Sequence, residues 1–254
     1  MISTTGISLI PLVGIPSVRP GDDLDFLVAQ ALTSIGGLQD DDIVVVAQKI
    51  VSKSEGRYVR LSDIAPSARA TEVAEGCGKD PRLVEVVLSE STDIVRNKPG
   101  VLIVRNRHGH VMANAGVDQS NVDQGNGETV LLLPVDPDHS ASRLKSGLDK
   151  WFGVSCGIVI ADSFGRPWRN GTTGTCIGAA GVTTLKDLRG LPDLYGRQLM
   201  VSQQAFGDET AAAASLLMGQ GQEGIPAVVL RGLTLDKSGS SRDLIRPKEL
   251  DLFT

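Results

Sequence analysis

Hydrophobic residues recur at helical spacing in four stretches of the chain. The first stretch follows Asp22-Asp23 and precedes Gly36-Gly37, and its apolar side chains recur at i, i+3, i+4 and i+7: Leu24, Leu27, Val28, Ala31, Leu32 and Ile35. The second begins with Asp80 as N-cap and Pro81 as the first helical residue, and continues to Leu88. The same reasoning predicts two further helices, over Ser140–Phe152 and Asp208–Met218.

Short runs rich in Val, Ile and Leu lie between these helices. They lack a clean alternation of apolar and polar residues, which is typical of strands buried on both faces. The predicted strands are Ile43–Ala47, Val101–Arg105, Val130–Leu133, Ile158–Ala161 and Ala227–Leu230. Their irregular order relative to the helices favours an α+β fold, with mixed sheets and flanking helices, over a strictly alternating doubly wound sheet.

Composition limits the classes of function. The 254 residues, 41% of them hydrophobic, suffice for one large core or two modest domains. With 25 Lys and Arg against 30 Asp and Glu, the net charge is −5, so no basic field is available to neutralise nucleic-acid phosphates. We therefore expect no general nucleic-acid binding, and any polyanionic substrate has to be held by a local site.

The sequence also bears on the compartment. No run approaches the roughly 20 apolar residues that cross a bilayer, and the start MISTTGISLIPLV lacks the basic region of a secretory signal. We therefore expect a cytoplasmic protein without membrane insertion. The three cysteines share no C-x-x-C spacing, which predicts reduced and mostly buried thiols at Cys77, Cys156 and Cys176.

Two features suggest phosphate binding. GQGQEG at Gly219–Gly224 matches the dinucleotide fingerprint, but it follows a predicted helix and precedes a predicted strand, so a nicotinamide-dependent oxidoreductase is disfavoured. Its glycines either cap the helix or let backbone N–H groups approach a phosphate. The sequence has no P-loop. Lys49 and Lys53 would share one face of a helix and suit a triphosphate, although such a pair is also typical of a solvated edge.

Acidic residues gather in three polar loops: Asp118 in NAGVDQSNV, Asp136 and Asp138 in PVDPDHS, and Asp162 with Ser163 in IADSFGRPWRNG. Such oxygen ligands suit Mg²⁺ or Mn²⁺, and carboxylates from distant loops can hold a pair of these ions against a triphosphate. Each aspartate is also typical of a turn or a cap, and Asp138 would cap a helix starting at Ser140. Asp162 is the strongest candidate, because it ends a hydrophobic strand where a carboxylate is costly to place.

Two arginines follow Asp162 in the same loop. Arg166 and Arg169 can bind a carboxylate or a phosphate through paired hydrogen bonds. They can equally be exposed side chains that flank Trp168. Both interpretations stay open at this point.

Seven segments together resemble the coenzyme F420-0:L-glutamate ligase family. They follow one another over nearly the whole chain: VGIPSVRPGDDL, VVVAQKIVSKSEGR, ANAGVDQSNV, LLPVDPDHSA, IADSFGRPWRNGTTGTCIGAAG, DLYGR and LLMGQGQEGIPAVVLRG. The resemblance implies a GTP-using enzyme that adds γ-linked L-glutamate to the lactyl phosphate side arm of a deazaflavin, coenzyme F420-0, and then to F420-1. It implies an acyl-phosphate intermediate, Mg²⁺ or Mn²⁺, two ions per site, and K⁺.

The resemblance also implies site residues and an assembly. Metal-ligand positions of the family match Asp118, Asp162, Ser163 and Gln220. GTP-contacting positions match Ile15, Pro16, Ser17, Val18, Gln48, Lys49, Lys53, Asn121, Met218, Gly219, Gln220, Gly221, Gln222, Glu223, Gly224 and Ile225. We expect Asp162, Asp118 and Lys53 to be catalytic. Residues 1–254 would form one ligase unit, with two interlocked subdomains, in an intertwined homodimer.

One further class of function stays open. A non-catalytic regulatory protein that binds GTP and metal would carry the same phosphate-binding and acidic features. It would bind nucleotide without any glutamate-dependent release of GDP.

Overall fold

A five-stranded mixed sheet forms the centre of the computed structural model, which describes residues 6–122, 128–236 and 238–251. In spatial order its strands are β1 (Ser8–Pro11), β12 (Ala227–Arg231), β2 (Ile43–Ala47), β8 (Gly157–Arg166) and β9 (Arg169–Ala180). β2 and β8 are parallel, and the other neighbouring pairs are antiparallel. This mixed sheet confirms the α+β class and excludes the doubly wound alternative.

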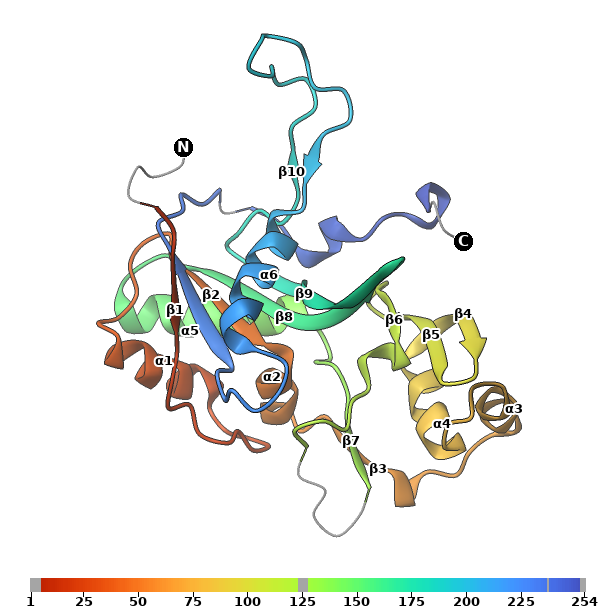
Figure 1. The fold of residues 1–254 in the computed structure, drawn as a ribbon. Coiled ribbons are helices and arrows are strands. Elements are labelled where there is room, and N and C mark those ends of the chain that lie inside the picture. The colour runs from red at the N-terminus through yellow and green to blue at the C-terminus, as the bar shows by residue number, and fades with distance from the viewer. Residues whose placement is uncertain (1–5, 123–127, 237, 252–254) are drawn as a thin grey trace.

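Helices cover both faces of this sheet (Figure 1). Val44 and Val46 of β2 belong to the core formed with α1 (Leu24–Ser34), α5 (Pro137–Phe152) and the start of α2 (Gln48–Ser54). Ile43 and Val45 belong to the opposite core, under α6 (Phe206–Met218). Successive strand residues point to opposite faces, so a strand covered on both sides is apolar throughout. The unbroken hydrophobic runs in the sequence have this origin.

A second group of elements, drawn to the right of the sheet in Figure 1, packs around its own core. It contains α3 (Ala68–Cys77), α4 (Pro81–Ser89), a three-stranded sheet of β4 (Ser91–Lys98), β5 (Val101–Asn106) and β6 (Val111–Ala113), a two-stranded sheet of β3 (Tyr58–Arg60) and β7 (Thr129–Leu131), and the 3-10 turns η1 (Leu61–Asp63) and η2 (Asn114–Gly116). Division into interlocked subdomains stays a prediction.

Two segments extend beyond these cores. β10 (Lys186–Asp187) pairs with β11 (Gln203–Gln204) at the base of a projecting arm, residues 188–202. The C-terminal segment contains the 3-10 turns η3 (Ser241–Leu244) and η4 (Lys248–Leu250) and returns to the second group, where Asp251 forms an ion pair with Arg105.

Most predicted elements are present. Asp23 caps α1 by accepting from Phe26 N–H at 3.1 Å, and Asp80 with Pro81 begins α4. The predicted helix Ser140–Phe152 is present as α5, but its predicted start was wrong: the helix begins at Pro137, with Asp136 as its N-cap. Asp138 lies inside the first turn.

Two sequence expectations concern accessibility. The three cysteines are free thiols and buried, as predicted. Among the described residues, no helix combines the length and the apolar character needed to span a membrane.

Candidate functional site

Four segments meet at one edge of the central sheet. β2 and β8 run parallel and in register, with Ala47 opposite Ala161, so the residues that follow each strand emerge at the same edge. β12 begins at this edge, because Ala227 pairs with Val46, and β1 ends there at Pro11. Ligand sites commonly form where parallel strands end and their loops diverge. The chain order therefore brings loops from distant parts of the sequence together.

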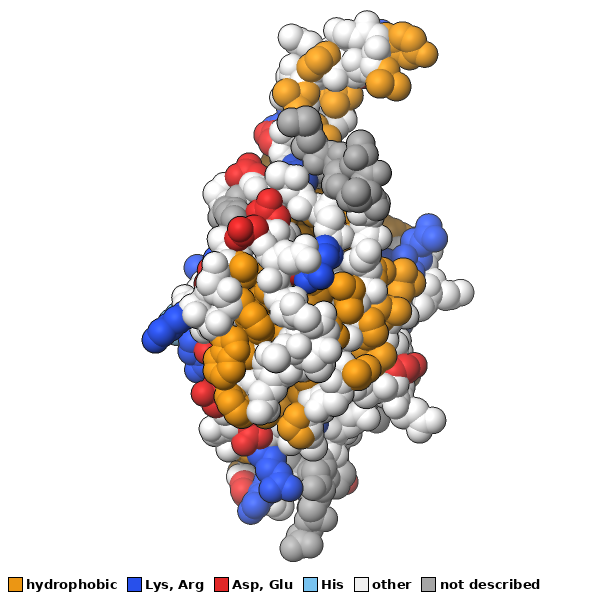
Figure 2. All heavy atoms as spheres, turned by 90° about the vertical axis from the view of Figure 1, so that its left-hand side faces the viewer, with side chains coloured by type: hydrophobic (Ala, Val, Ile, Leu, Met, Phe, Trp, Pro, Cys, Tyr) orange, Lys and Arg blue, Asp and Glu red, His pale blue; other side chains and the backbone are white. Residues whose placement is uncertain are grey.

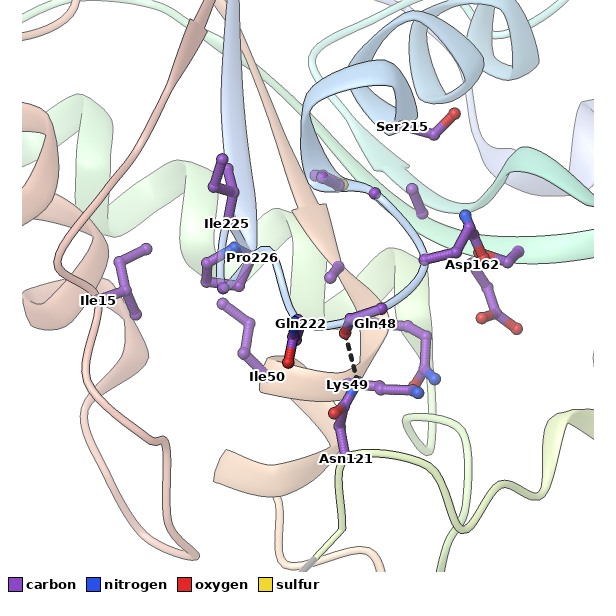
Figure 3. Close-up of a pocket in the computed structure, with 18 of the residues that line it drawn as sticks. Ile15, Gln48, Lys49, Ile50, Asn121, Asp162, Ser215, Gln222, Ile225 and Pro226 are labelled. Carbon is purple, nitrogen blue, oxygen red and sulfur yellow. Dashed lines mark hydrogen bonds between the residues drawn. The ribbon is translucent and has the colours of Figure 1, made fainter.

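These segments enclose a pocket of about 530 Å³, a size typical of sites for small molecules (Figure 3). Its lining comes from the segment after β1, the start of α2, the end of β8, the base of β9 and the loop between α6 and β12. The lining residues are Ile15, Pro16, Ser17, Ala47, Gln48, Lys49, Ile50, Lys53, Asn121, Ala161, Asp162, Ser163, Gly174, Ser215, Met218, Gly219, Gln220, Gly221, Gln222, Gly224, Ile225 and Pro226.

The two predicted lysines lie on α2 and reach toward the same loop. Lys49 Nζ is 2.8 Å from Asp118 Oδ2 and donates to Ser120 Oγ at 2.5 Å. Lys53 Nζ donates to the carbonyl oxygen of Asn121 at 2.7 Å. The four-residue spacing therefore places both ammonium groups on one side of a helix, as the sequence predicted.

Asp162 is the first residue of β8 beyond the end of β2, and its carboxylate lies deep in the pocket. Burial raises the pKa of Asp162 to about 6, and the charge of Asp118 adds to this effect. Hydrogen bonds from the backbone N–H of Ser163 and the Gln48 side chain, together with the charge of Lys49, oppose it. Gln48 is itself buried and fixed, because its Oε1 accepts from Ser52 Oγ at 2.9 Å.

Asp118 has the opposite behaviour. Burial favours its neutral form, but hydrogen bonds from Lys49 and from the N–H and hydroxyl of Ser120 outweigh burial and hold its pKa below the ordinary value. The two predicted carboxylates therefore lie close enough to affect each other's titration, with Lys49 acting on both. Asp118 itself is set behind Lys49 and does not line the pocket.

The donor set suits a hard divalent cation. Asp162, Ser163 and Gln220 line the pocket and carry oxygen atoms that can bind such a cation. Asp118 is linked to the pocket by its ion pair with Lys49, which also lines it. The raised pKa of Asp162 marks negative charge that the protein offsets only in part, and a cation would offset it further. In the part of the chain that the structure describes, no group of three or more His, Cys, Asp or Glu side chains is arranged for a metal. A cation here would need Ser163, Gln220 or substrate oxygens as further ligands.

The glycine-rich loop crosses the mouth of the pocket between α6 and β12. This helix-before-strand order is the one read from the sequence, and it differs from the order of a dinucleotide fold. The loop's N–H groups converge on an anion: Glu223 accepts from Gly221 N–H at 2.8 Å, and backbone N–H groups lower its pKa. Asn121 holds the loop by donating to Gly221 O at 3.3 Å (Figure 3).

Several predicted residues lie outside the pocket. Val18 is buried in the core with the central sheet, and Glu223 turns back onto its own loop. Asp136 caps α5, while the Asp138 carboxylate accepts from Ala179 N–H at 2.8 Å and Ser240 Oγ at 2.6 Å. The loop containing Asp136 and Asp138 therefore serves the fold, which is the alternative that the sequence had left open for these residues.

Sequence reasoning from the residues missed some of the lining. Gly174 belongs to β9, and a Cβ atom there would be 2.3 Å from the carbonyl oxygen of Ala211 in α6. Glycine at this position lets α6 pack directly on the strand beside Ser163. Ser215 lies on the same helix and also lines the pocket, while its hydroxyl donates to Ala212 O at 2.7 Å. A single glycine inside a threonine-rich run was the one signal available.

Comparisons with known proteins identify the family to which the chain is similar. A model of the family described as F420-0:Gamma-glutamyl ligase matches residues 13–232. The chain is similar to the coenzyme F420:L-glutamate ligase of Methanothermobacter thermautotrophicus, at 46% identity over 98% of this chain and 99% of that protein. Proteins of the same name from Methanopyrus kandleri and Archaeoglobus fulgidus are 44% and 42% identical, over 99% and 97% of this chain and 98% and 96% of theirs.

Proposed function

Because the chain belongs to the F420-0:γ-glutamyl ligase family, we propose that it joins L-glutamate to coenzyme F420-0 and F420-1 through a γ-linkage, at the expense of GTP and with a divalent metal. The observation that carries this proposal is the convergence of Lys49, Lys53, Asp162 and the glycine-rich loop on one pocket. These groups come from three separate parts of the chain and combine cations, a carboxylate and backbone N–H groups that already bind an anionic side chain.

The triphosphate of GTP is assigned to the side of the pocket formed by α2 and the loop. Two ammonium groups and several backbone N–H groups suit phosphate oxygens. Glu223 already shows that the loop's N–H groups can hold a carboxylate. A phosphate oxygen would replace that carboxylate on the same donors. The nucleoside would extend toward Ile15, which lies across the loop from Asp162 (Figure 3).

Asp162, Ser163 and Gln220 would hold the divalent metal, and Asp118 would join them once Lys49 leaves its carboxylate for the phosphates. When bound, the metal would neutralise charge on the transferring phosphate and polarise it toward attack. Gln48 acts through Asp162: its amide is buried and keeps the carboxylate turned to the pocket. The chain's own contribution is to position the reactants and to offset charge, as in other phosphoryl transfers.

In this scheme the acceptor's terminal carboxylate attacks the γ-phosphate of GTP, an oxygen–phosphorus bond forms, and GDP leaves. The amine of L-glutamate then attacks the carbonyl carbon of the acyl phosphate. Phosphate leaves, and the amide remains. Lys49 and Lys53, which line the pocket, hold the phosphates during the first step.

Phosphate release tests this function against the regulatory alternative. We expect GDP and phosphate to appear only when GTP, Mg²⁺ or Mn²⁺, coenzyme F420-0 and L-glutamate are all present, and omission of any one should abolish sustained release. A protein that binds GTP but releases phosphate independently of L-glutamate would contradict the proposal and favour a regulatory role.

A further inference from the structure

The hairpin of β8 and β9 continues past the central sheet as a free ribbon. β2 ends opposite Ala161, and from Asp162 onward β8 pairs only with β9. Ser163 and Gly174, opposite each other at the base of this ribbon, line the pocket. Figure 1 shows the ribbon reaching from the sheet toward β6. The strand that supplies Asp162 therefore also forms, with β9, a two-stranded ribbon that projects beside the pocket.

Contacts on both faces fix the direction of the ribbon. Phe164 packs edge-on against the buried ring of His110, with centroids 5.5 Å apart. On the other face, Thr172 Oγ1 lies 3.4 Å from Gln220 Oε1 in the glycine-rich loop. One contact joins the ribbon to the second group of elements and the other joins it to the pocket loop. The tip is thus held in place relative to the pocket.

The tip itself is a two-residue turn, Pro167-Trp168, between paired Arg166 and Arg169. Trp168 has a φ of +56°, in the left-handed region that bulky residues rarely occupy. In turns with proline at the first central position and a positive φ at the second, the second residue is usually glycine. Its side chain is 81% exposed. A backbone in this region displays a large, mostly exposed aromatic ring at the ribbon tip, and strained positions of this kind cluster at ligand sites.

The two arginines beside this ring are available for an anion. Both are exposed, and Arg166 uses one Nη2 contact, to Asn170 O at 3.1 Å. Within the described part of the chain, neither guanidinium forms an ion pair with a carboxylate. Guanidinium groups in this state match the geometry of phosphate and carboxylate oxygens.

We propose that the ribbon tip is a binding site for the acceptor, in which Trp168 stacks on its planar aromatic ring and Arg166 and Arg169 bind its phosphate. This inference rests on the proposed function, which makes the acceptor a deazaflavin with a phosphate in its side arm. Arg166 lies four residues after Asp162 along β8, a rise of roughly 13 Å at 3.3 Å per residue. A ring held at the tip would leave the side arm to run along the ribbon toward Asp162.

Kinetics with the full chain test this site. Trp168→Gly removes the ring and relieves the positive φ, so the melting temperature should stay equal or rise while KM for F420-0 increases by about tenfold. Arg166→Gln with Arg169→Gln should increase that KM by about ten- to a hundredfold. In both variants KM for GTP and for L-glutamate, and kcat at saturating F420-0, should change by less than about twofold.

Conservative and remote variants serve as controls. Trp168→Phe, which keeps an aromatic ring, should restore most of the affinity for F420-0. Trp151→Phe and Arg60→Gln alter exposed side chains elsewhere and should leave all three KM values unchanged. An unaltered KM for F420-0 in Trp168→Gly and in the arginine variant, with an active parent enzyme, would overturn the acceptor site alone. A parent protein that transfers no glutamate would overturn the proposed function and this inference with it.

Discussion

Asp162 lies where the doubly covered part of β8 ends, and its environment penalises its charge. Burial raises its pKa to about 6, from an ordinary value of 3.8. A carboxylate in this state binds protons more tightly in the folded protein than in the unfolded chain. The same charge that makes Asp162 a good cation ligand therefore reduces the stability of the metal-free protein at neutral pH.

The sign of this effect gives a prediction for metal-free protein. The stabilising contribution of protonated Asp162 is fully present below about pH 4 and is lost as pH rises through about 6, with an upper limit of about 3 kcal/mol. Asp162→Asn removes this titration. We would measure the free energy of unfolding by urea in EDTA for both proteins. The value for Asp162→Asn minus the value for the parent should increase between pH 4 and pH 7. A difference independent of pH in this window would show that the pKa of Asp162 is not raised.

Lys53 offers a second test at this scale. Its ammonium group now binds the carbonyl oxygen of Asn121 at the pocket wall, and a triphosphate would compete for it. Lys53→Gln should increase KM for GTP by about ten- to a hundredfold and leave KM for L-glutamate near its parent value. Lys150→Gln, on an exposed face of α5, is the matched control. Equal effects of the two substitutions on KM for GTP would contradict the assignment of Lys53.

Individual site residues were predictable to different degrees. Asp162 could be identified because an acid at the end of an apolar run is costly, and Lys49 and Lys53 because of their helical spacing. The role of Glu223 could not be predicted from the sequence, because its carboxylate folds back onto N–H groups of its own loop. Val18 likewise differs from its pocket neighbours only in the direction of its side chain, and that direction depends on packing with the core.

Among the elements, the turn from α6 into β12 depends most on particular residues. Gly219 caps α6 with φ 66° and ψ −167°, a conformation essentially restricted to glycine. A Cβ atom at this position would lie 2.1 Å from Glu223 Cδ. The helix end and the anion-binding loop are therefore set by the same residue.

Gly219→Ala should thus disturb both the end of α6 and the glycine-rich loop. We expect a loss of stability of about 1–3 kcal/mol and a clear increase in KM for GTP, because the loop must move away from the new methyl group. Gly219→Ala combined with Glu223→Ala removes the clash and keeps the unfavourable backbone angles. Recovery of KM for GTP in the double variant, with stability still reduced, is the expected result. A parent-like KM in Gly219→Ala would mean that this loop does not contact GTP.

The elements with a strong hydrophobic signal were the ones that could be predicted. β2, β8 and β12 are apolar throughout because helices cover both faces of the sheet. α2 was missed as a definite helix because it has seven residues, and its buried positions include Gln48 and Ser52. The whole of β9 was missed. Its outer half is polar and exposed, as expected for a ribbon outside the sheet, and its buried inner half is rich in glycine and alanine.

At the scale of the molecule, the arm between β10 and β11 carries apolar side chains away from the core. Leu194, Tyr195, Met200 and Val201 are 77–98% exposed, and Figure 2 shows hydrophobic side chains gathered at the end of this arm. Such a cluster is unusual on the surface of a monomer. We propose that the arm packs on a second copy of the chain and forms the homodimer that the family resemblance implies.

Light scattering after size exclusion tests this assembly. The parent protein should have the mass of a dimer, and Leu194→Asp with Met200→Asp should shift it toward the monomer at micromolar concentration. Leu216→Asp combined with Val135→Asp, at two exposed apolar positions outside the arm, adds the same charge and serves as the control, with the dimer expected to persist. A monomeric parent would contradict the homodimer, and a dimer that survives both arm substitutions would place its interface elsewhere.

The arrangement of the whole chain was the least predictable level. The sequence indicated an α+β class, but the order of strands in the sheet depends on pairing between β1 and β12, which lie at opposite ends of the chain. Residues 118–121 likewise pack against α2 through contacts between distant parts of the sequence, such as the hydrogen bond from Lys49 to Ser120. Periodicity records which face of an element is buried. It does not record which distant element covers that face.

The central claim is that this pocket couples GTP cleavage to glutamate transfer through Asp162. Mass spectrometry of the deazaflavin, after incubation of F420-0 with GTP, Mg²⁺ and L-glutamate, tests it most directly. The parent protein should convert F420-0 into products heavier by one and then two glutamyl units, and Asp162→Asn should reduce the rate by orders of magnitude while remaining folded. Unmodified F420-0 with the parent protein, or parent-like conversion by Asp162→Asn, would contradict the account.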